Sequence, residues 1–227
     1  MIWILVSIVV VLILLYSVVP TYCYKLKTLI EKARRTSEKT LYITFDDGPE
    51  PEFTNILLNT LRKYDVKATF FVVAKSAQKN SILIDRIKNE GHLIGLHSLE
   101  HKNAMIKGPL YTNKDFKESI EIMRELNVDI KYYRPPWGHF NLFTMINIRK
   151  YNLKPALWDV IIGDWKEDVS SDIIERSLIK RIGNNSYIIC LHDGRGRNDA
   201  PLKMVEALNN LIPAWLETGY QFMKIDS

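Results

Sequence analysis

Two adjacent acids, Asp46 and Asp47, follow an apolar run of the chain and are of a type and placement that could do chemistry. The run, residues 41–45, is typical of a buried strand, and Gly48-Pro49 then turns the chain into a loop. Carboxylates at the end of a buried strand cost folding free energy unless a partner neutralises them or they serve a function. One acid could bind a metal while the other acts as a base, or both could simply cap a turn.

Histidines strengthen the first interpretation. His97 and His101 are four residues apart, a common spacing for two metal ligands on one helical turn. Together with one carboxylate they would make a two-histidine, one-carboxylate set with open positions, which suits zinc or another divalent transition metal. His192 closes a later apolar run, whereas His92 precedes its run and is interpreted as structural. The remaining histidine, His139, is given no role.

The elements that must position these residues alternate between strand-like and helix-like stretches. Apolar runs alternate with amphipathic stretches, which predicts βα units with parallel strands, in a barrel or in an open doubly wound sheet. In either architecture the site lies at the carboxyl ends of the strands. The expected strands are 41–45, 68–73, 93–97, 131–133, 155–158, 187–192 and 220–225, and the expected helices are 53–64, 81–89, 115–126, 142–151, 172–182 and 201–216.

The chain begins differently. Residues 2–19 are uncharged and apolar, about long enough to span a bilayer, and they lack the basic start and small-residue cleavage site of a signal peptide. We therefore expect a transmembrane anchor over residues 1–22, a basic juxtamembrane linker over 23–39, and one catalytic domain over 40–227. The alternative for the apolar segment is a buried core helix.

The net charge of the chain limits the classes of binding partner that we expect. The 227 residues carry a net charge of +5, which suits a negatively charged surface such as a membrane or cell wall. The basic residues are too few and too scattered to predict nucleic-acid binding. Cys190 lies inside an apolar strand pattern and is interpreted as a small buried hydrophobe.

Five motifs follow one another along the chain: Thr44-Phe-Asp-Asp-Gly-Pro49, His97-Ser-x-x-His101, Arg134-Pro-Pro-Trp-Gly138, Asp164-Trp165 and Leu191-His192-Asp193. Together they resemble the polysaccharide deacetylase family, also called NodB-like or carbohydrate esterase family four. The match runs from about residue 40 to the end, and it implies a distorted (β/α)7 barrel. It also implies a metal-dependent hydrolase that removes N-acetyl groups from a glycan such as cell-wall or surface N-acetylglucosamine polymer.

The resemblance implies a role for each matching residue. Asp47, His97 and His101 would hold one divalent metal, most simply zinc. Asp46 would be the general base that activates water, Arg134 would orient Asp46, and His192 would be the general acid. Three further residues would bind substrate: Trp137 beside the oxyanion, and Trp165 and Leu191 around the acetyl group.

One position departs from the family pattern. Many members have Asp three residues before the Asp of Asp-Trp, where it would hydrogen-bond the acid histidine, and this chain has Ile161 there. We therefore expect His192 to lack that partner and to lose its proton at a lower pH, unless Asp159 or Asp193 substitutes.

Three functions stay open at this point. The same water and oxyanion site would serve an N-deacetylase or an O-acetyl esterase, and a glycan-binding protein with an impaired site is a third possibility. A surface glycan as substrate would place the catalytic domain outside the cytoplasm. The charge bias opposes this placement, because five Lys and Arg residues follow the apolar segment and none precedes it.

Overall fold

The computed structural model describes residues 2–35 and 39–226. Met1 and residues 36–38, within the expected anchor and linker, lie outside this range, as does Ser227 at the end of the expected catalytic domain. The strands are β1 (Thr40–Asp46), β2 (Thr69–Val72), β3 (Leu93–Leu96), β4 (Tyr132–Tyr133), β5 (Lys154–Pro155), β6 (Val160–Ile161), β7 (Tyr187–His192) and β8 (Gln221–Phe222).

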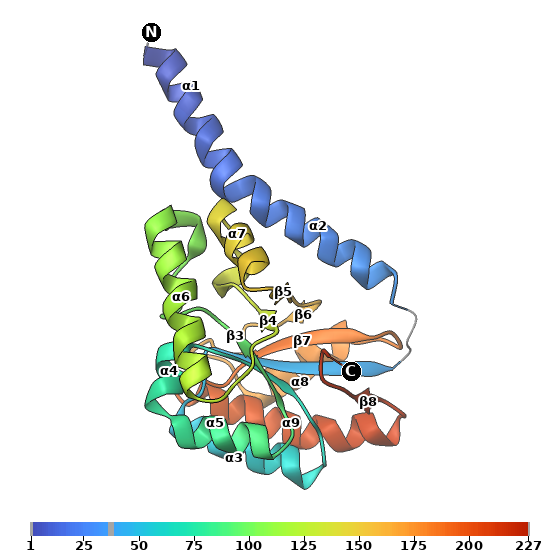
Figure 1. The fold of residues 1–227 in the computed structure, drawn as a ribbon. Helices are drawn as coiled ribbons and strands as arrows, with labels where there is room; N and C mark the ends of the chain where they lie inside the picture. Colours follow the sequence, from blue (N-terminus) through green and yellow to red (C-terminus); the bar gives the residue numbers. More distant parts are fainter. Residues whose placement is uncertain (1, 36–38, 227) are drawn as a thin grey trace.

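The helices come close to the expected spans. They are α1 (Ile2–Ile13), α2 (Val19–Ala33), α3 (Pro51–Lys63), α4 (Ala74–Lys79), α5 (Ser81–Asn89), α6 (Pro109–Glu125), α7 (Leu142–Lys150), α8 (Ser171–Arg181) and α9 (Ala200–Glu217) (Figure 1). A π-helical turn, η1 (Leu14–Val18), joins α1 to α2, and two 3-10 turns, η2 (Ala104–Ile106) and η3 (Pro136–Gly138), lie in loops.

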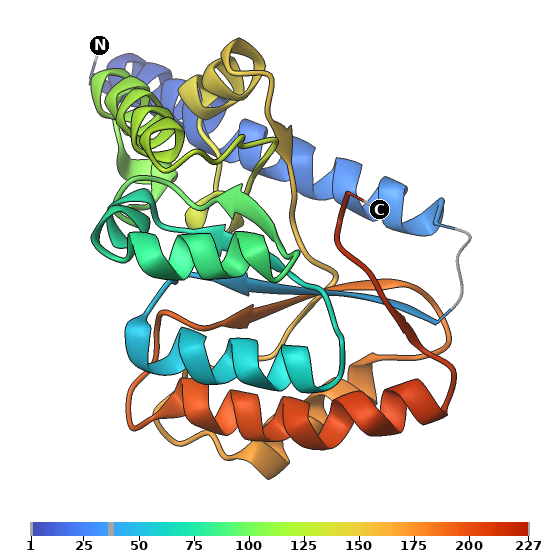
Figure 2. The same cartoon turned by 60° about the horizontal axis from the view of Figure 1, so that its bottom comes forward.

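The strands form one parallel sheet with the order β5-β4-β3-β2-β1-β7-β6. Among the described strands, β5 and β6 end this order and do not pair with each other, so the curled sheet stays open between them. This architecture confirms the expected parallel α/β barrel and its distortion. In Figure 2, α3, α8 and α9 lie on one side of the sheet and the long N-terminal helix lies on the other.

Two strands differ from the expectation. The structure adds β6, which has only two residues and is too short to show an alternating pattern. The run expected at 220–225 forms only β8, which pairs with the beginning of β1 at Thr40 and Leu41. Strand β6 therefore ends the strand order at one edge, and β8 lies off this order.

The core explains why β1 is central. Leu41, Ile43 and Phe45 are each at most 1% exposed, and β1 pairs with β7 along six residues and with β2 along three. A strand that pairs on both edges and is covered by helices has a sequence that is nearly continuously apolar. This burial holds the end of β1, and therefore Asp46, in a fixed position.

The N-terminal helix is more than an anchor joined by a linker. Residues 2–15 are exposed, but from Tyr16 onward one face of the helix contacts the barrel, at Ser17, Thr21 and Tyr24. These positions follow helical spacing. The stretch expected as a linker is helical to Ala33 and packs on the barrel; its division from the anchor stays a prediction.

Polar groups dominate this contact. The Thr21 hydroxyl donates to the Phe140 carbonyl at 2.9 Å and accepts from the Phe140 N–H at 2.9 Å. Tyr24 stacks on Phe140 with ring centroids 4.3 Å apart, and Arg35 pairs with the buried carboxylate of Asp159. Asp159 lies between β5 and β6 and lines a pocket with Leu29 and Lys32 of α2, so α2 covers the open seam of the barrel.

Replacing Thr21 by Val tests whether α2 is part of the domain. The variant removes two buried hydrogen bonds to Phe140, which should lower the free energy of unfolding by about 1–3 kcal/mol. Thermal unfolding of the full chain in one detergent would measure the loss. Thr28→Val is the matched control, because the Thr28 hydroxyl donates only within its own helix, to the Tyr24 carbonyl at 3.0 Å. Equal unfolding temperatures of the two variants would contradict docking of α2.

Candidate active site

Parallel register brings the predicted residues together. Asp46 and His192 are direct partners at the ends of β1 and β7. His97 follows the last residue of β3, and Arg134 follows the last residue of β4. Because parallel strands end at one edge of the sheet, acids, histidines and an arginine from four strands meet there.

Backbone conformation explains how two neighbouring acids serve one site. Successive strand residues point to opposite faces, but Asp47 has a φ of 76° and leaves the strand in the left-handed region. This turn is held by a close approach of Gly194, where a Cβ would lie 2.4 Å from the Asp47 carbonyl carbon. Left-handed backbone at a non-glycine residue is costly and clusters at functional sites.

Asp47, His97 and His101 form a compact set whose possible ligand atoms lie within 4.8 Å of one another. Asp47 Oδ1 is 3.2 Å from His97 Nε2 and 2.9 Å from His101 Nε2. Burial raises the pKa of Asp47, but the two histidines outweigh it and hold this pKa well below its ordinary value. Burial lowers the pKa of His101 more than Asp47 raises it. An ionised carboxylate and a neutral imidazole are the states that bind metal.

The surroundings of the set also fit a cation. His97 Nδ1 lies 2.8 Å from the Arg134 carbonyl oxygen, so this nitrogen carries the proton and Nε2 presents a lone pair. That lone pair faces Asp47, whose two carboxylate oxygens are buried without a hydrogen-bond donor. A lone pair directed at an ionised carboxylate is repulsive unless a cation lies between them, so these three residues fit a divalent metal.

Asp46 is held by a fully buried arginine. Arg134 Nη1 donates to Asp46 Oδ1 at 2.6 Å and to the Thr44 hydroxyl at 2.6 Å, while its Nε donates to the Ala156 carbonyl at 3.0 Å. The guanidinium also lies over the Phe71 ring, 4.0 Å from its centroid. Cys190, expected only to fill space, directs its thiol to Asp46 Oδ2 at 3.3 Å. Both oxygens of Asp46 are thereby positioned.

His192 has a carboxylate partner, so the expectation drawn from Ile161 is wrong. Asp164 Oδ1 lies 3.1 Å from His192 Nδ1, and Asp164 Oδ2 accepts the His192 backbone N–H at 2.7 Å. Burial lowers the pKa of His192, but Asp164 outweighs it and raises this pKa to about 9. A histidine that holds its proton above neutral pH can act as a general acid.

Neither of the two proposed substitutes reaches His192. Asp159 pairs with Arg35 and accepts the Ile188 N–H at 2.8 Å. Asp193 accepts the Thr54 hydroxyl at 2.6 Å, and its burial raises its pKa to about 7.

Aromatic side chains border both ends of the site. Trp137 lies 4.4 Å from His101 between ring centroids, and Trp165 meets His192 edge-on at 4.6 Å. Leu191 is fully buried in the core, in register with Phe45. Their contacts with substrate stay predictions.

The sequence did not predict Arg195 as a residue of the site. Its Nη1 lies 3.2 Å from His101 Nδ1 and 3.8 Å from Asp47 Oδ2. Arg195 lies in the loop after β7, where no periodic pattern of apolar residues indicates the direction of a side chain.

The other two histidines lie apart from this set. His92 Nδ1 accepts the Ala68 N–H at 3.1 Å, and burial lowers the His92 pKa to about 4, so this histidine is structural as expected. His139 Nδ1 lies 3.1 Å from Asn103 Oδ1.

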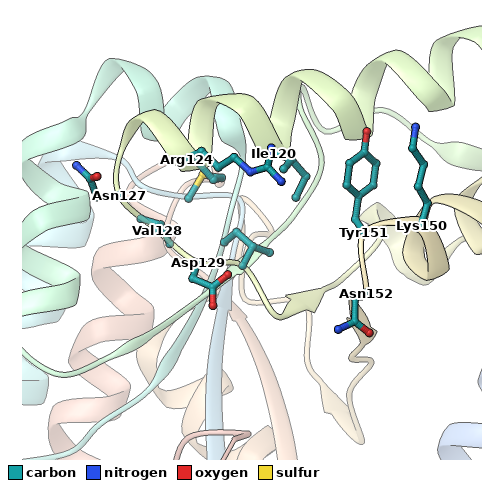
Figure 3. Close-up of a pocket in the computed structure, with 10 residues that line it drawn as sticks. Ile120, Arg124, Asn127, Val128, Asp129, Lys150, Tyr151 and Asn152 are labelled. Carbon is teal, nitrogen blue, oxygen red and sulfur yellow. The ribbon is translucent and has the colours of Figure 1, made fainter.

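A hollow of about 560 Å³ lies away from the site, between the end of α6 and the end of α7 (Figure 3). Its lining includes Asp129, which precedes β4, and Tyr151, which precedes β5. It therefore lies at the amino ends of these strands, on the edge of the barrel opposite the candidate site.

A parallel α/β barrel that presents a metal-type Asp-His-His set beside an arginine-bound acid and an acid-bound histidine defines the class of the protein: a hydrolase. The model of the polysaccharide deacetylase family matches residues 33–156, and the chain belongs to this family, which includes hydrolases that act on carbon–nitrogen bonds other than peptide bonds. The family resemblance, the fold and the enzyme class that the sequence predicted are thus confirmed.

Relatives agree with this assignment. A peptidoglycan-N-acetylglucosamine deacetylase of Bacillus cereus is 32% identical over 93% of this chain and 74% of its own length. The peptidoglycan-N-acetylmuramic acid deacetylase PdaA of Bacillus subtilis is 30% identical over 89% of this chain and 78% of its own. Among solved structures, a peptidoglycan N-acetylglucosamine deacetylase in complex with 4-naphthalen-1-yl-N-oxidanyl-benzamide superposes with a TM-score of 0.76 at 29% identity, over 83% of this chain and 87% of that one.

Proposed function

We propose that this protein removes N-acetyl groups from a cell-wall glycan of the peptidoglycan type, with one divalent metal bound by Asp47, His97 and His101. The observation that carries the proposal is the placement of this set beside two neighbouring groups that each have a charged partner. Asp46 is paired with Arg134, His192 is paired with Asp164, and possible ligand atoms of Asp46 and His192 lie within 4.8 Å of each other. The relatives named for peptidoglycan deacetylation support the choice of glycan.

The residues divide the reaction into two proton transfers. A cation held by the set would polarise the acetyl carbonyl and lower the pKa of water toward neutrality. Asp46, kept in place by Arg134, accepts a proton from the water whose oxygen attacks the acetyl carbon. When the carbon–nitrogen bond breaks, His192 donates its proton to the departing nitrogen, so the products are acetate and the free amine. Asp164 holds His192 in the orientation that this donation requires.

The function and its metal can be tested in one assay. The full chain should bind one equivalent of zinc and release acetate from N-acetylglucosamine oligomers or peptidoglycan, and His101→Ala should lose both properties. His139→Ala is the matched control, since His139 contacts Asn103 and not the metal set. Release of acetate only from O-acetylated glycan would contradict N-deacetylation, and full zinc and activity in His101→Ala would contradict the site.

We further propose that the chain is anchored in a membrane with its catalytic domain outside the cytoplasm. Of the described residues, only the helix over Ile2–Ala33 is long and apolar enough to cross a membrane, although a signal sequence meets the same criteria. The opposing charge bias rests on five basic residues of α2 and its end. Two of these, Lys32 and Arg35, contact Tyr187 and Asp159 of the barrel in the folded protein.

Protease treatment of intact, wall-stripped cells checks this placement. We expect the catalytic domain to be degraded in intact cells, because a surface glycan is the proposed substrate. A cytoplasmic protein followed in the same sample should stay whole until the cells are lysed. Full protection of the domain before lysis would reverse the proposed orientation.

A further inference from the structure

The apolar run of the N-terminal helix is longer than the part of the helix that is free of the barrel. Residues 2–15 are exposed, whereas the uncharged apolar run continues to Val19. Residues 16–19 therefore belong to the apolar segment and also lie where the helix meets the barrel.

Those overlapping residues cannot separate from the barrel without loss of specific contacts. The Tyr16 hydroxyl donates to the Lys107 carbonyl at 2.9 Å, and the Ser17 hydroxyl donates to the Met105 carbonyl at 2.8 Å. Thr21 makes its two hydrogen bonds with Phe140. The part of the domain next to these residues therefore lies at the level where the apolar segment ends.

The surface at this level is apolar. Ile106 in η2 is 79% exposed, Leu110 at the start of α6 is 88% exposed, and Leu142 at the start of α7 is 45% exposed. We call these three residues the apolar shoulder. Ile106 and Leu142 line an apolar groove of about 730 Å³ together with helix residues such as Leu12 and Ile13, so the shoulder is continuous with the exposed helix. Figure 1 shows α7 directly beside the bend between α1 and α2.

We propose that the apolar shoulder lies in the membrane, so that the catalytic domain is partly inserted into the outer edge of the bilayer. Depths of about 5–10 Å are usual for apolar surfaces at the boundary of headgroups and acyl chains. Large apolar side chains at this exposure mark an interaction site, and continuity with the anchor helix selects lipid as its partner.

The insertion has a consequence for the enzyme. His101 is separated from the start of η2 by only two residues, and Trp137 is separated from Leu142 by four. The segments that form the candidate site thus lead directly into the shoulder. Bilayer contact therefore holds the site near the membrane surface, where it would meet glycan close to the membrane. This inference rests on the proposed anchoring and not on the proposed chemistry.

A fluorescent probe placed on the shoulder tests the contact. A thiol-reactive fluorophore is attached to Leu110→Cys in the full chain, with Cys23 replaced by Ser because Cys23 is exposed and Cys190 is buried. The protein is placed in nanodiscs of phosphatidylcholine and phosphatidylglycerol. A spin-labelled lipid, labelled near the headgroup end of its acyl chain, should quench this probe, and aqueous iodide should have little effect. Ile82→Cys on α5 is the matched control; Ile82 is 84% exposed and should show the opposite pattern.

A probe at Ile8→Cys, midway along α1, separates the possible failures. If lipid quenches Ile8 and iodide quenches Leu110 as strongly as Ile82, the shoulder lies in water, and the inference is overturned while the anchor stands. If lipid does not quench Ile8, the anchor and the inference both fail. If Leu110 is shielded from both quenchers, a second copy of the chain covers the shoulder, which also overturns lipid contact. Acetate release plays no part in these measurements.

Discussion

Replacing Asp46 by Asn will lower the turnover number by about 10²- to 10⁴-fold and leave zinc binding intact. This range is what a general base usually contributes to a reaction. The amide of Asn cannot accept the proton of water, but it is nearly the size of the carboxylate and keeps the end of β1 in place. Asp46 also lies outside the set formed by Asp47, His97 and His101, whose ligand atoms are close to one another without it. Steady-state kinetics and metal analysis of the same sample provide the measurement.

A control variant and two contrary outcomes make the Asp46→Asn measurement decisive. Asp65→Asn, at a turn residue whose side chain is 91% exposed, is the control and should keep wild-type turnover. Loss of zinc from Asp46→Asn would mean that Asp46 and Asp47 have exchanged roles. Turnover within a few-fold of wild type, with zinc bound, would remove Asp46 from the reaction.

Much of the site follows from position in the sequence. Acids, histidines and an arginine that follow apolar runs must meet once the runs are paired as parallel strands, and Asp46, His97, Arg134 and His192 do so. The prediction required no side-chain geometry, because the ends of parallel strands converge whatever the details of packing.

The partner of His192 could not be obtained in this way. Strand β6 places Ile161 in register with Cys190, two residues before His192, so position 161 lies below the level of the histidine. The chain then turns at Gly163, which has a φ of 76°, and this turn brings Asp164 beside His192. Spacing along the sequence shows that an acid is near the end of β6, but the turn decides which acid reaches the imidazole.

The packing of α2 on the barrel could not be predicted from the sequence for a different reason. Hydropathy identifies apolar faces, whereas α2 contacts the barrel through the hydroxyl of Thr21 and the ring of Tyr24, and the charge of Arg35 just beyond α2 adds an ion pair. Its apolar side chains, such as Leu26 and Leu29, are exposed instead. A basic and polar composition is typical of a linker, so the composition of residues 23–35 did not indicate a packed helix.

Replacing Asp164 by Asn will shift the alkaline limb of the pH–rate profile to lower pH. His192 must carry its proton to act as an acid, so activity falls as the pH rises through the His192 pKa. In the wild type, burial lowers this pKa, but Asp164 more than compensates and raises it to about 9. Asn keeps a group that can accept the His192 backbone N–H but removes the charge, so we expect the pKa to fall to its ordinary value of 6.5 or below. The protonated fraction at pH 9 would then fall by about 10²-fold.

The same change alters stability in a direction that can be checked independently. Because the folded-state pKa of His192 lies above 6.5, the proton stabilises the folded protein at pH values below 6.5, and this contribution is lost as the pH rises through about 9. Asp164→Asn should therefore destabilise the protein more at pH 6 than at pH 10 in thermal unfolding. Asp168→Asn, at an exposed acid four residues later, is the matched control and should change neither profile. An unmoved alkaline limb in a folded, zinc-loaded Asp164→Asn variant would show that His192 is not the acid whose ionisation limits the reaction.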